Sequence, residues 1–423
     1  MTINFKSKLT RSKEAAANDR WKISDIFFLI AMFAFEDFAC LVDSNATIIS
    51  GVRYTDVAVI LSLALAFYVF LKTWKMPKNK FRFLVPFCVF GISTVISALQ
   101  GYFLLGQPVL LGVLPFRRLY AAMLFSLVVA RAVQTDVISK RRLLRMLYVI
   151  SLIELSLFTA QAVFAGSFQF LAIETGEFRF GLVRLRVPFL LPLFCGILSF
   201  NHYLNSETKD KLSEICHLLF SLWSIILIAF ICQHRAPTII LLLSYFAALL
   251  LWKGNGGVKS LAIMTAVVIF AGALFTPQMQ TAFQVISGDN VTASSENSLG
   301  IRKSGHDYYL IRLQESPLFG FGWPNSNYAP ALSAAGEGYL YYAADNGIYG
   351  LAYILGAFGC VCVVTLCIFA LRRSWVVGKR KGYGLLQYFL FESGNLYMGL
   401  HWFYYYPMPF MIAFALLEVE DAS

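Results

Sequence analysis

Long apolar runs, separated by short polar connections, occupy most of this 423-residue chain. A helix that crosses a bilayer needs roughly 20 apolar residues. The runs predict about twelve transmembrane helices, with both chain termini on the same side of the membrane. We expect these helices near residues 23–42, 56–73, 83–100, 114–131, 145–165, 187–203, 214–232, 236–252, 260–276, 348–371, 384–400 and 407–419.

The connections divide the chain into four parts. Residues 1–22 form a polar, basic tail, and residues 23–276 hold the first nine helices, with a long connection near 166–186. Residues 277–347 form one large loop, and residues 348–419 hold the last three helices. Long loops in compact proteins are usually functional or disordered, and this loop has too many aromatic residues for disorder. The pattern predicts an all-α polytopic membrane protein with a large, helical, functional loop.

Inside the large loop, the spacing of apolar residues predicts an amphipathic helix from Arg302 to Glu315. Its residues Tyr309, Leu310 and Leu313 are expected to face the membrane. A Ser-Pro-Leu-Phe-Gly-Phe-Gly segment at 316–322 is expected to end this helix in a turn, because Pro and Gly disfavour its continuation.

Composition supports the membrane assignment and excludes other classes. Hydrophobic residues make up 58% of the chain and charged residues 14%, whereas a soluble domain averages about 25% charged residues. The net charge of +11 does not indicate nucleic-acid binding, because the charges lie in short runs between apolar stretches. The eight cysteines form no CxxC or Cys/His ligand pattern, so we interpret them as small packing residues.

Lys and Arg are distributed unequally between the two sides of the predicted bundle. With the N-terminus inside, 25 lie inside and 10 outside, which together make the 35 of the chain. Cytoplasmic connections are enriched in Lys and Arg, so both termini are expected in the cytoplasm. Nine of the ten outside residues are arginines, namely Arg53, Arg117, Arg118, Arg179, Arg184, Arg186, Arg235, Arg302 and Arg312, beside Lys303.

This preference for arginine points to anion binding, because the planar guanidinium matches two phosphate oxygens at once. The alternative is pairing with nearby carboxylates such as Glu174, Glu177, Asp307 or Glu315. Arg235 stands out, since it lies between two apolar runs with almost no loop and must sit at the outer membrane face. It is expected either to clamp an anion or to reach toward the headgroups as an interface residue. Carboxylates within predicted spans are further functional candidates, and they are Glu36, Asp37, Glu154 and Glu392.

Four elements in the second half of the chain resemble the bacterial O-antigen ligases and the Wzy-type repeat-unit polymerases. They are Arg302 with its amphipathic helix, the Pro-Leu-Phe-Gly-Phe-Gly turn, Tyr339-Leu340, and the Gly-Ile-Tyr-Gly at 347–350 that opens the next span. His234-Arg235-Ala236 occupies the place of a further family motif. The resemblance covers about residues 230–370. It implies a GT-C-like fold in the bacterial inner membrane, with the active site facing the periplasm.

The chain departs from the ligases at one position. Ligases commonly carry a histidine-asparagine pair three residues before the tyrosine-leucine segment, where this chain has Gly336-Glu337. The ligase histidine is thought to act as a base toward the acceptor sugar. Its absence favours a polymerase, with Glu337 as the substitute base and His306 and Asp345 as alternatives.

The resemblance implies glycosyl transfer from an undecaprenyl-pyrophosphate-linked glycan to a second lipid-linked repeat unit, making O-antigen, capsule or exopolysaccharide. The diphosphate leaving group needs charge stabilisation, which arginines can supply in place of a metal. No DxD-like cluster occurs in the outside segments, and we expect no cofactor. A chain-length regulator protein is a further expected partner. Two rival functions remain open: an O-antigen ligase acting on lipid A-core, and a lipid-linked oligosaccharide flippase.

The resemblance to the polymerases implies a role for each candidate residue. Arg235 and Arg302 would hold the pyrophosphate, and Glu337 would be the general base. Candidates for binding the second substrate are Arg179, Arg184, Arg186, Arg117, Arg118 and His306. Tyr339 could stack on a sugar ring or pack with the loop against the membrane interface. Arg117 and Arg118 could equally cap the membrane interface.

Overall fold

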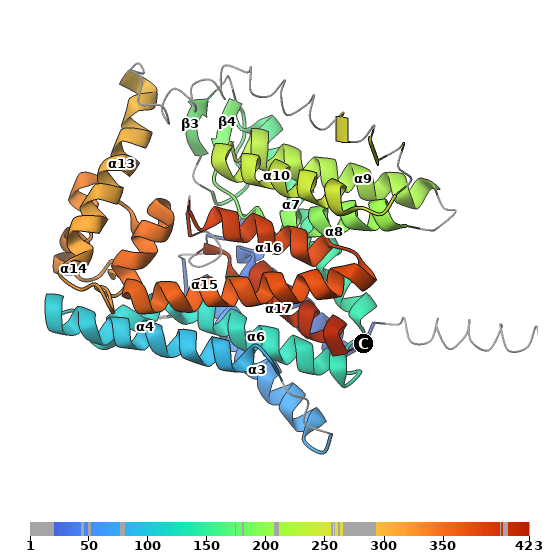
Figure 1. Ribbon diagram of the computed structural model, residues 1–423, viewed down its shortest axis with the longest axis horizontal. Coiled ribbons are helices and arrows are strands. Elements are labelled where there is room, and N and C mark those ends of the chain that lie inside the picture. The colour runs from blue at the N-terminus through green and yellow to red at the C-terminus, as the bar shows by residue number, and fades with distance from the viewer. Residues whose placement is uncertain are drawn as a thin grey trace, which may run out of the picture.

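The protein is a bundle of helices with two short hairpins (Figure 1). The computed structural model describes residues 21–43, 46–49, 52–76, 81–173, 175–179, 182–206, 211–254, 257, 259–260, 263–264, 293–397, 399–400 and 405–422. The predicted cytosolic tail up to residue 20 and most of the predicted span at 260–276 lie outside these residues.

Helices occur at the other eleven predicted spans. They are α2 (Ile23–Phe35), α3 (Tyr54–Thr73), α4 (Leu84–Leu105), α5 (Val109–Val113) with α6 (Arg117–Gln134), α7 (Lys140–Phe164), α8 (Leu190–Asn205), α9 (Lys211–Ile226), α10 (Arg235–Leu251), α15 (Gly347–Lys381), α16 (Gly384–Asn395) and α17 (Pro407–Ala422). Two more lie in the large loop, α13 (Ala293–Leu313) and α14 (Ala329–Ala334).

Six helical segments in the described part of the chain are long and apolar enough to cross a membrane, judged by length and composition. They are Tyr54–Thr73, Leu84–Leu105, Val109–Gln134, Lys140–Phe164, Lys211–Ile231 and Ala343–Lys381. Ile23–Phe35 and Ala236–Leu251 are shorter apolar helices. The chain is therefore consistent with an all-α membrane protein, while the predicted number of twelve spans is not confirmed.

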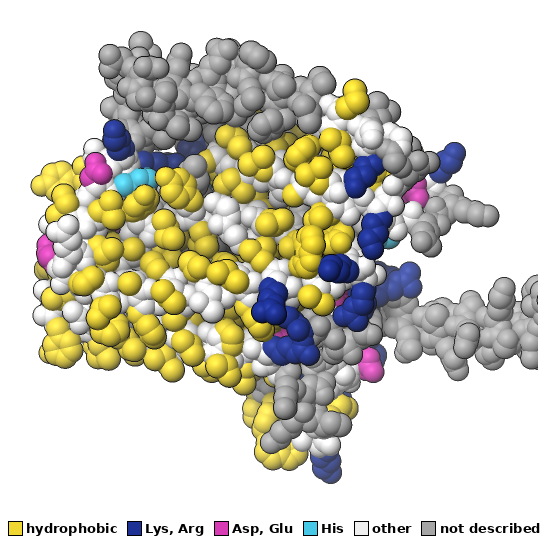
Figure 2. Space-filling view, viewed as in Figure 1, with side chains coloured by type: hydrophobic (Ala, Val, Ile, Leu, Met, Phe, Trp, Pro, Cys, Tyr) yellow, Lys and Arg dark blue, Asp and Glu magenta, His cyan; other side chains and the backbone are white. Residues whose placement is uncertain are grey.

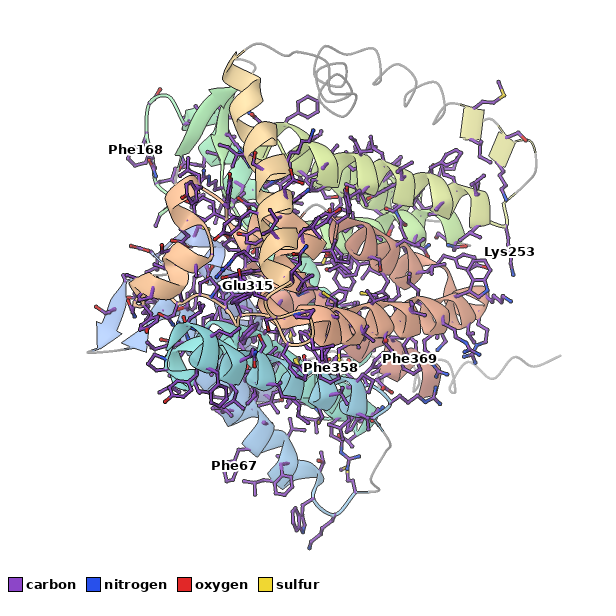
Figure 3. All side chains as sticks on the ribbon, turned by 60° about the vertical axis from the view of Figure 1, so that its left-hand side comes forward. Phe67, Phe168, Lys253, Glu315, Phe358 and Phe369 are labelled. Carbon is purple, nitrogen blue, oxygen red and sulfur yellow. The ribbon has the colours of Figure 1, made fainter. Side chains whose placement is uncertain are left out.

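The flanks of the bundle are apolar, as expected for helices that face lipid. Phe67 of α3 and Val361 of α15 are 65% and 63% exposed. Figure 3 shows Phe67 pointing away from the other helices, and Figure 2 shows hydrophobic side chains over much of the visible flank. Exposed apolar side chains at this density suit a hydrocarbon environment and not water.

Ion pairs hold one end of the bundle together, which we call the basic end. Lys140 at the start of α7 pairs with Glu420 near the end of α17 at 2.5 Å, and Arg142 pairs with Asp25 near the start of α2 at 2.6 Å. Figure 2 shows Lys and Arg gathered at this end, near the C-terminus. Two basic runs of the sequence lie in these helices: residues 140–145 form the start of α7, and residues 372–381 form the end of α15.

The opposite end, which we call the loop end, carries α13, α14 and a hairpin of β3 (Thr175–Arg179) and β4 (Leu182–Leu185) (Figure 1). A second small hairpin, β1 (Thr47–Ile49) with β2 (Val52–Arg53), precedes α3. The sequence predicted an all-α protein without strands, because both hairpins are short and lie between long apolar runs that dominate the pattern.

Candidate functional site at the loop end of the bundle

Helix α13 packs along the first turns of α15 through aromatic rings. His306 stacks on Tyr349 with ring centroids 4.3 Å apart, and Tyr309 meets Tyr353 at 5.0 Å. The Tyr309 hydroxyl is buried and donates to the backbone oxygens of Ala335 and Tyr341, both at 3.0 Å. A helix is thus confirmed in this region, over Ala293–Leu313 instead of 302–315, but Tyr309 faces the protein and not the membrane. A phenol that loses water needs a hydrogen-bond acceptor, which lipid cannot supply.

The turn after α13 fills a break in α15. Helix α15 is interrupted at Gly356, where φ is 65° and ψ is −173°. The backbone N–H groups of Ala357 and Phe358 donate to the Pro317 and Leu318 oxygens at 2.8 and 3.0 Å. A break in an apolar helix leaves backbone groups that must find partners within the protein. The turn supplies acceptors for the C-terminal side of the break.

The same turn also donates back to the N-terminal side of the break. Phe321 N–H donates to the Tyr353 oxygen at 2.8 Å, and Gly322 N–H donates to the Ile354 oxygen at 3.0 Å. The Ser97 hydroxyl of α4 donates to that same Ile354 oxygen. The Pro-Leu-Phe-Gly-Phe-Gly motif is therefore a backbone plug between α4 and α15, and it fixes where α13 ends.

Glycine is required on both sides of this contact. Gly320 has φ of 68°, and a Cβ there would lie 2.5 Å from the Ile354 oxygen. A Cβ on Gly356 would lie 2.4 Å from the Leu318 carbonyl. Both positions combine a left-handed backbone with a close approach of two main chains, which only glycine accommodates.

The segment after the plug is clamped to the turn between α4 and α5. Gln107 Nε2 donates to the Trp323 oxygen at 2.9 Å, and its Oε1 accepts from Asn325 N–H at 2.9 Å. Asn325 Nδ2 donates to the Leu111 oxygen at 2.8 Å, and the Tyr328 hydroxyl donates to Leu105 at 3.1 Å. The second half of the large loop is thereby held as a rigid part of the bundle.

His306 of α13 stacks on Tyr349 of α15, and Asn346 approaches α13 at the preceding residue, where a Cβ on Gly305 would lie 2.8 Å from Asn346 Oδ1. Arg302 is half-buried and lies close enough to His306 to influence it. Burial, and then the Arg302 charge, lower the pKa of His306, so its ring is neutral near pH 7. The Asn346 side chain donates to the Tyr342 oxygen at 2.7 Å, while its buried Oδ1 has no hydrogen-bond partner among the residues that the structure describes. This arrangement offers a fixed positive charge beside neutral hydrogen-bonding groups.

Glu337 and Tyr339 lie on the short helical turn Glu337–Tyr339, called η4. Glu337 is half-buried, and burial raises the pKa of its carboxyl. Tyr339 is 67% exposed. Glu337 also lies near enough to the buried Tyr309 phenol to interact electrostatically with it. The η4 turn therefore lies close to Tyr309 of α13.

Arg235 begins α10 at the loop end, directly after His234. The His234 ring packs on Phe189 with centroids 4.9 Å apart. Arg184 of β4 reaches the same place, where its Nε donates to the Cys232 oxygen at 3.1 Å. The structure thus joins the hairpin to the start of α10. The Arg235 side chain lies outside the described part of the structure.

The other two arginines of the hairpin region have different environments. Arg186 follows β4 and is exposed. Arg179 ends β3, where its backbone pairs with Leu182, and its side chain is not among those described. Figure 1 shows the hairpin and α13 at the same end of the molecule.

Arg117 and Arg118 are both paired with carboxylates of the chain. Arg117 Nε contacts Asp56 Oδ1 at 2.6 Å, and Arg118 Nη2 contacts Asp37 Oδ1 at 2.9 Å. Arg118 also donates to the Phe35 oxygen at 2.6 Å. These contacts favour the alternative in which the two arginines pair with carboxylates of the chain over phosphate binding. The pair with Asp37 is one that the sequence left open.

The other carboxylates of the predicted spans are fully buried. Glu36, Glu154 and Glu392 are 0% exposed, and their carboxyl oxygens have no hydrogen-bond partner within the described residues. Glu154 interacts electrostatically with Glu36 and Asp37, and Glu392 lies beside Tyr388. They lie in the helix bundle, apart from α13 and η4.

Sequence reasoning missed several residues that shape this site. Asp56 and Asn346 had no visible signal, because Arg117 and Gly305, which they approach in the fold, lie far away in the sequence. Tyr349 and Tyr353 have a four-residue spacing that places both on one helix face, which could have indicated a contact with α13. Among the described residues, no group of three or more His, Cys, Asp or Glu is arranged to hold a metal ion.

Comparison with known proteins adds no identity. No protein-family model matches the chain, and no curated protein matches it. The case for a function therefore rests on the residues and geometry of the loop end.

Proposed function

We propose that this protein is an inner-membrane glycosyltransferase of the Wzy type, which polymerises repeat units carried on undecaprenyl pyrophosphate. The loop end would face the periplasm and the basic end the cytoplasm, in line with the Lys/Arg bias. The observation that carries the proposal is the plug at 316–322. It is part of the motif that resembles the family, and in this fold it anchors α13, the helix that carries Arg302.

In the proposed reaction, one bond forms at the anomeric carbon of the donor and one bond to that carbon breaks. A hydroxyl oxygen of the acceptor repeat unit forms a bond to the anomeric carbon of the donor glycan. The bond from that carbon to the lipid diphosphate breaks, and its electron pair leaves with the diphosphate. The acceptor proton passes to a base. Direct displacement of this kind inverts the anomeric configuration.

Arginines suit the leaving group in this reaction. The negative charge on the diphosphate grows as the bond breaks, and guanidinium groups stabilise such charge most where water is scarce. Arg302 is half-buried on α13, and Arg235 starts α10 at the same end of the molecule. In this proposal the two residues bind the diphosphate, and the neutral His306 and Asn346 complete the polar surroundings.

Glu337 suits the base. A carboxylate with a raised pKa accepts a proton more readily than an ordinary one, and burial raises the pKa of Glu337. Its turn is held against α13 through the hydrogen bond from Tyr309 to Tyr341. Arg184 and Arg186 of the hairpin region would contact the second lipid-linked substrate.

The test is a reconstituted reaction. Purified protein in sealed proteoliposomes is incubated with a synthetic undecaprenyl-pyrophosphate repeat unit in the presence of EDTA, and products are separated on a gel. A ladder of multimers supports the polymerase. Decoration of added lipid A-core without multimers supports a ligase instead. Movement of the substrate across the bilayer with no new glycosidic bond supports a flippase, and either of these two results overturns the proposal.

A further inference from the structure

A continuous series of aromatic rings runs from the exposed tip of η4 into the protein core. Tyr339 stacks on Tyr341, with ring centroids 5.8 Å apart and planes 29° apart. Tyr341 meets Tyr308 at 5.5 Å, and Tyr308 meets Tyr309 at 5.7 Å. We call these four tyrosines, with Tyr353, the ring ladder.

The inner end of the ladder is anchored in the plug. Tyr309 meets Tyr353 at 5.0 Å, and Tyr353 stacks on Phe321 at 5.0 Å with planes only 12° apart. The Arg312 guanidinium lies over the Phe321 ring, 4.8 Å from its centroid, and forms an ion pair with Glu315 at 2.5 Å. Figure 3 shows Glu315 at the end of α13, next to α15. The exposed ring of Tyr339 is thus held in place by packing that extends to the core.

The backbone of the turn also serves to present Tyr339. The Gly336 oxygen accepts from the N–H groups of both Tyr339 and Tyr341, at 2.9 and 3.1 Å. Gly336 and Leu340 both have left-handed backbones, with φ of 81° and 62°. Such a conformation costs about 1 kcal/mol or more for a non-glycine residue such as Leu340, and strain of this kind concentrates at binding sites.

The surroundings of the exposed ring fit a carbohydrate. The Tyr339 ring is 67% exposed, and Glu337 supplies a carboxylate on the same turn. An aromatic face next to hydrogen-bonding groups matches a sugar ring, which has an apolar C–H face and hydroxyls at its edge. A ring fixed before binding loses little entropy when it stacks on a ligand.

We propose that Tyr339, supported by Tyr341, is a stacking platform for a pyranose ring of the acceptor repeat unit. This inference rests on the proposed function and adds the place where the acceptor sugar would bind. The platform holds the acceptor sugar beside Glu337, so that one hydroxyl of that sugar reaches the base. Tyr339 is therefore a residue that sets acceptor affinity and orientation and takes no part in proton transfer.

The test measures sugar binding without lipid or diphosphate. The probe is the repeat-unit oligosaccharide released from the polymer of the source bacterium, titrated against the full-length protein in nanodiscs and followed by saturation-transfer NMR. Tyr339→Ala is expected to weaken binding roughly tenfold, the size typical of one lost stacking contact. Tyr339→Phe is expected to bind within roughly threefold of the unmodified chain, since the ring remains. Tyr342→Ala serves as the control, because Tyr342 is exposed on the same segment but is not part of the ladder.

A second pair of variants separates the platform from general loop damage. A Cβ on Gly336 would lie 2.9 Å from the Tyr341 ring, whereas a Cβ on Gly338 meets nothing within 4 Å. Gly336→Ala is expected to weaken oligosaccharide binding with Tyr339 still present, and Gly338→Ala is expected to leave it unchanged.

The outcomes distinguish this inference from the proposed function. If multimers form and Tyr339→Ala binds the oligosaccharide as tightly as the unmodified chain, the platform is wrong and the polymerase stands. If the oligosaccharide does not bind and no multimers form, both are wrong. If Tyr339→Ala leaves oligosaccharide binding unchanged and alters only how closely the turn approaches brominated lipids of the nanodisc, Tyr339 is a membrane-interface residue and the platform is again wrong.

Discussion

Replacing Gly320 by alanine should displace the plug from the break in α15. The alanine would have to adopt φ near 68°, and its Cβ would lie 2.5 Å from the Ile354 oxygen and 2.6 Å from the Gly356 nitrogen. Both neighbours are main-chain atoms and cannot rotate away as a side chain would. The main chain of the plug must move, and the hydrogen bonds from Phe321 and Gly322 to α15 lengthen or break.

The expected loss can be built from its parts. A left-handed backbone costs alanine about 1 kcal/mol or more. Two weakened backbone hydrogen bonds add about 1 kcal/mol each. The sum is about 3 kcal/mol, which lowers the melting temperature by roughly 3–4 °C, because an unfolding entropy of about 2.1 cal/mol/K per residue gives about 0.9 kcal/mol/K for a chain of 423 residues.

The assay is thermal unfolding of the purified protein in detergent, with apparent melting temperatures compared at one scan rate. The matched control is Gly338→Ala, because that Cβ meets nothing within 4 Å and the substitution is chemically identical. The control should melt within about 1 °C of the unmodified protein. If Gly320→Ala also melts within that range, the plug does not hold α15 and the account of the motif is refuted.

Three further predictions concern the site and its supports. Arg302→Ala should reduce the polymerisation rate at least roughly a hundredfold, and Arg302→Lys should reduce it less. Lys303→Ala, at the exposed neighbouring position, should have a near-normal rate in the same gel assay, and equal rates for all three variants would contradict the diphosphate role. A base must be deprotonated, and burial raises the pKa of Glu337, so activity should fall on acidification at a higher pH than it would with an ordinary glutamate. Glu337→Gln should remove this acid limb of the pH–rate profile together with most of the rate, and an unchanged profile in the variant would exclude Glu337 as the base. Asp37→Ala leaves the nearly buried Arg118 charge without its carboxylate, which should cost about 3 kcal/mol in unfolding experiments; the added change Arg118→Leu should recover part of it, and no recovery would show that the ion pair is not the cause.

The positions of the helices could be predicted from the sequence because each depends on a local apolar run. Eleven of the predicted segments coincide with helices, and α13 was expected from its spacing. What determines these elements lies within about 20 consecutive residues, which is the length a bilayer requires.

The break in α15 could not be predicted, because its cause lies elsewhere in the chain. Residues 348–371 form one uninterrupted apolar pattern, and Gly356 is an ordinary glycine within it. The helix opens there because the plug at 316–322 supplies hydrogen-bond partners to both sides. Neither segment alone contains this information.

The candidate site was predictable in its residue types and only partly in its geometry. The arginine excess pointed to the loop end of the bundle but could not separate Arg302 on α13 from Arg118, which pairs with a carboxylate about eighty residues earlier in the chain. Tyr309 was assigned to the membrane face because apolar spacing takes no account of its hydroxyl group. The ring ladder was not foreseen, since it joins three segments that meet only in the fold.

The central claim is tested most directly by the stoichiometry of a single round of transfer. Purified protein is mixed with a repeat unit on isotopically labelled undecaprenyl pyrophosphate, and mass spectrometry counts dimer and free lipid diphosphate. A polymerase yields one free labelled lipid diphosphate for each dimer formed, and Arg302→Ala yields neither. Release of lipid diphosphate without dimer, or no release while the substrate crosses the bilayer, would contradict the account.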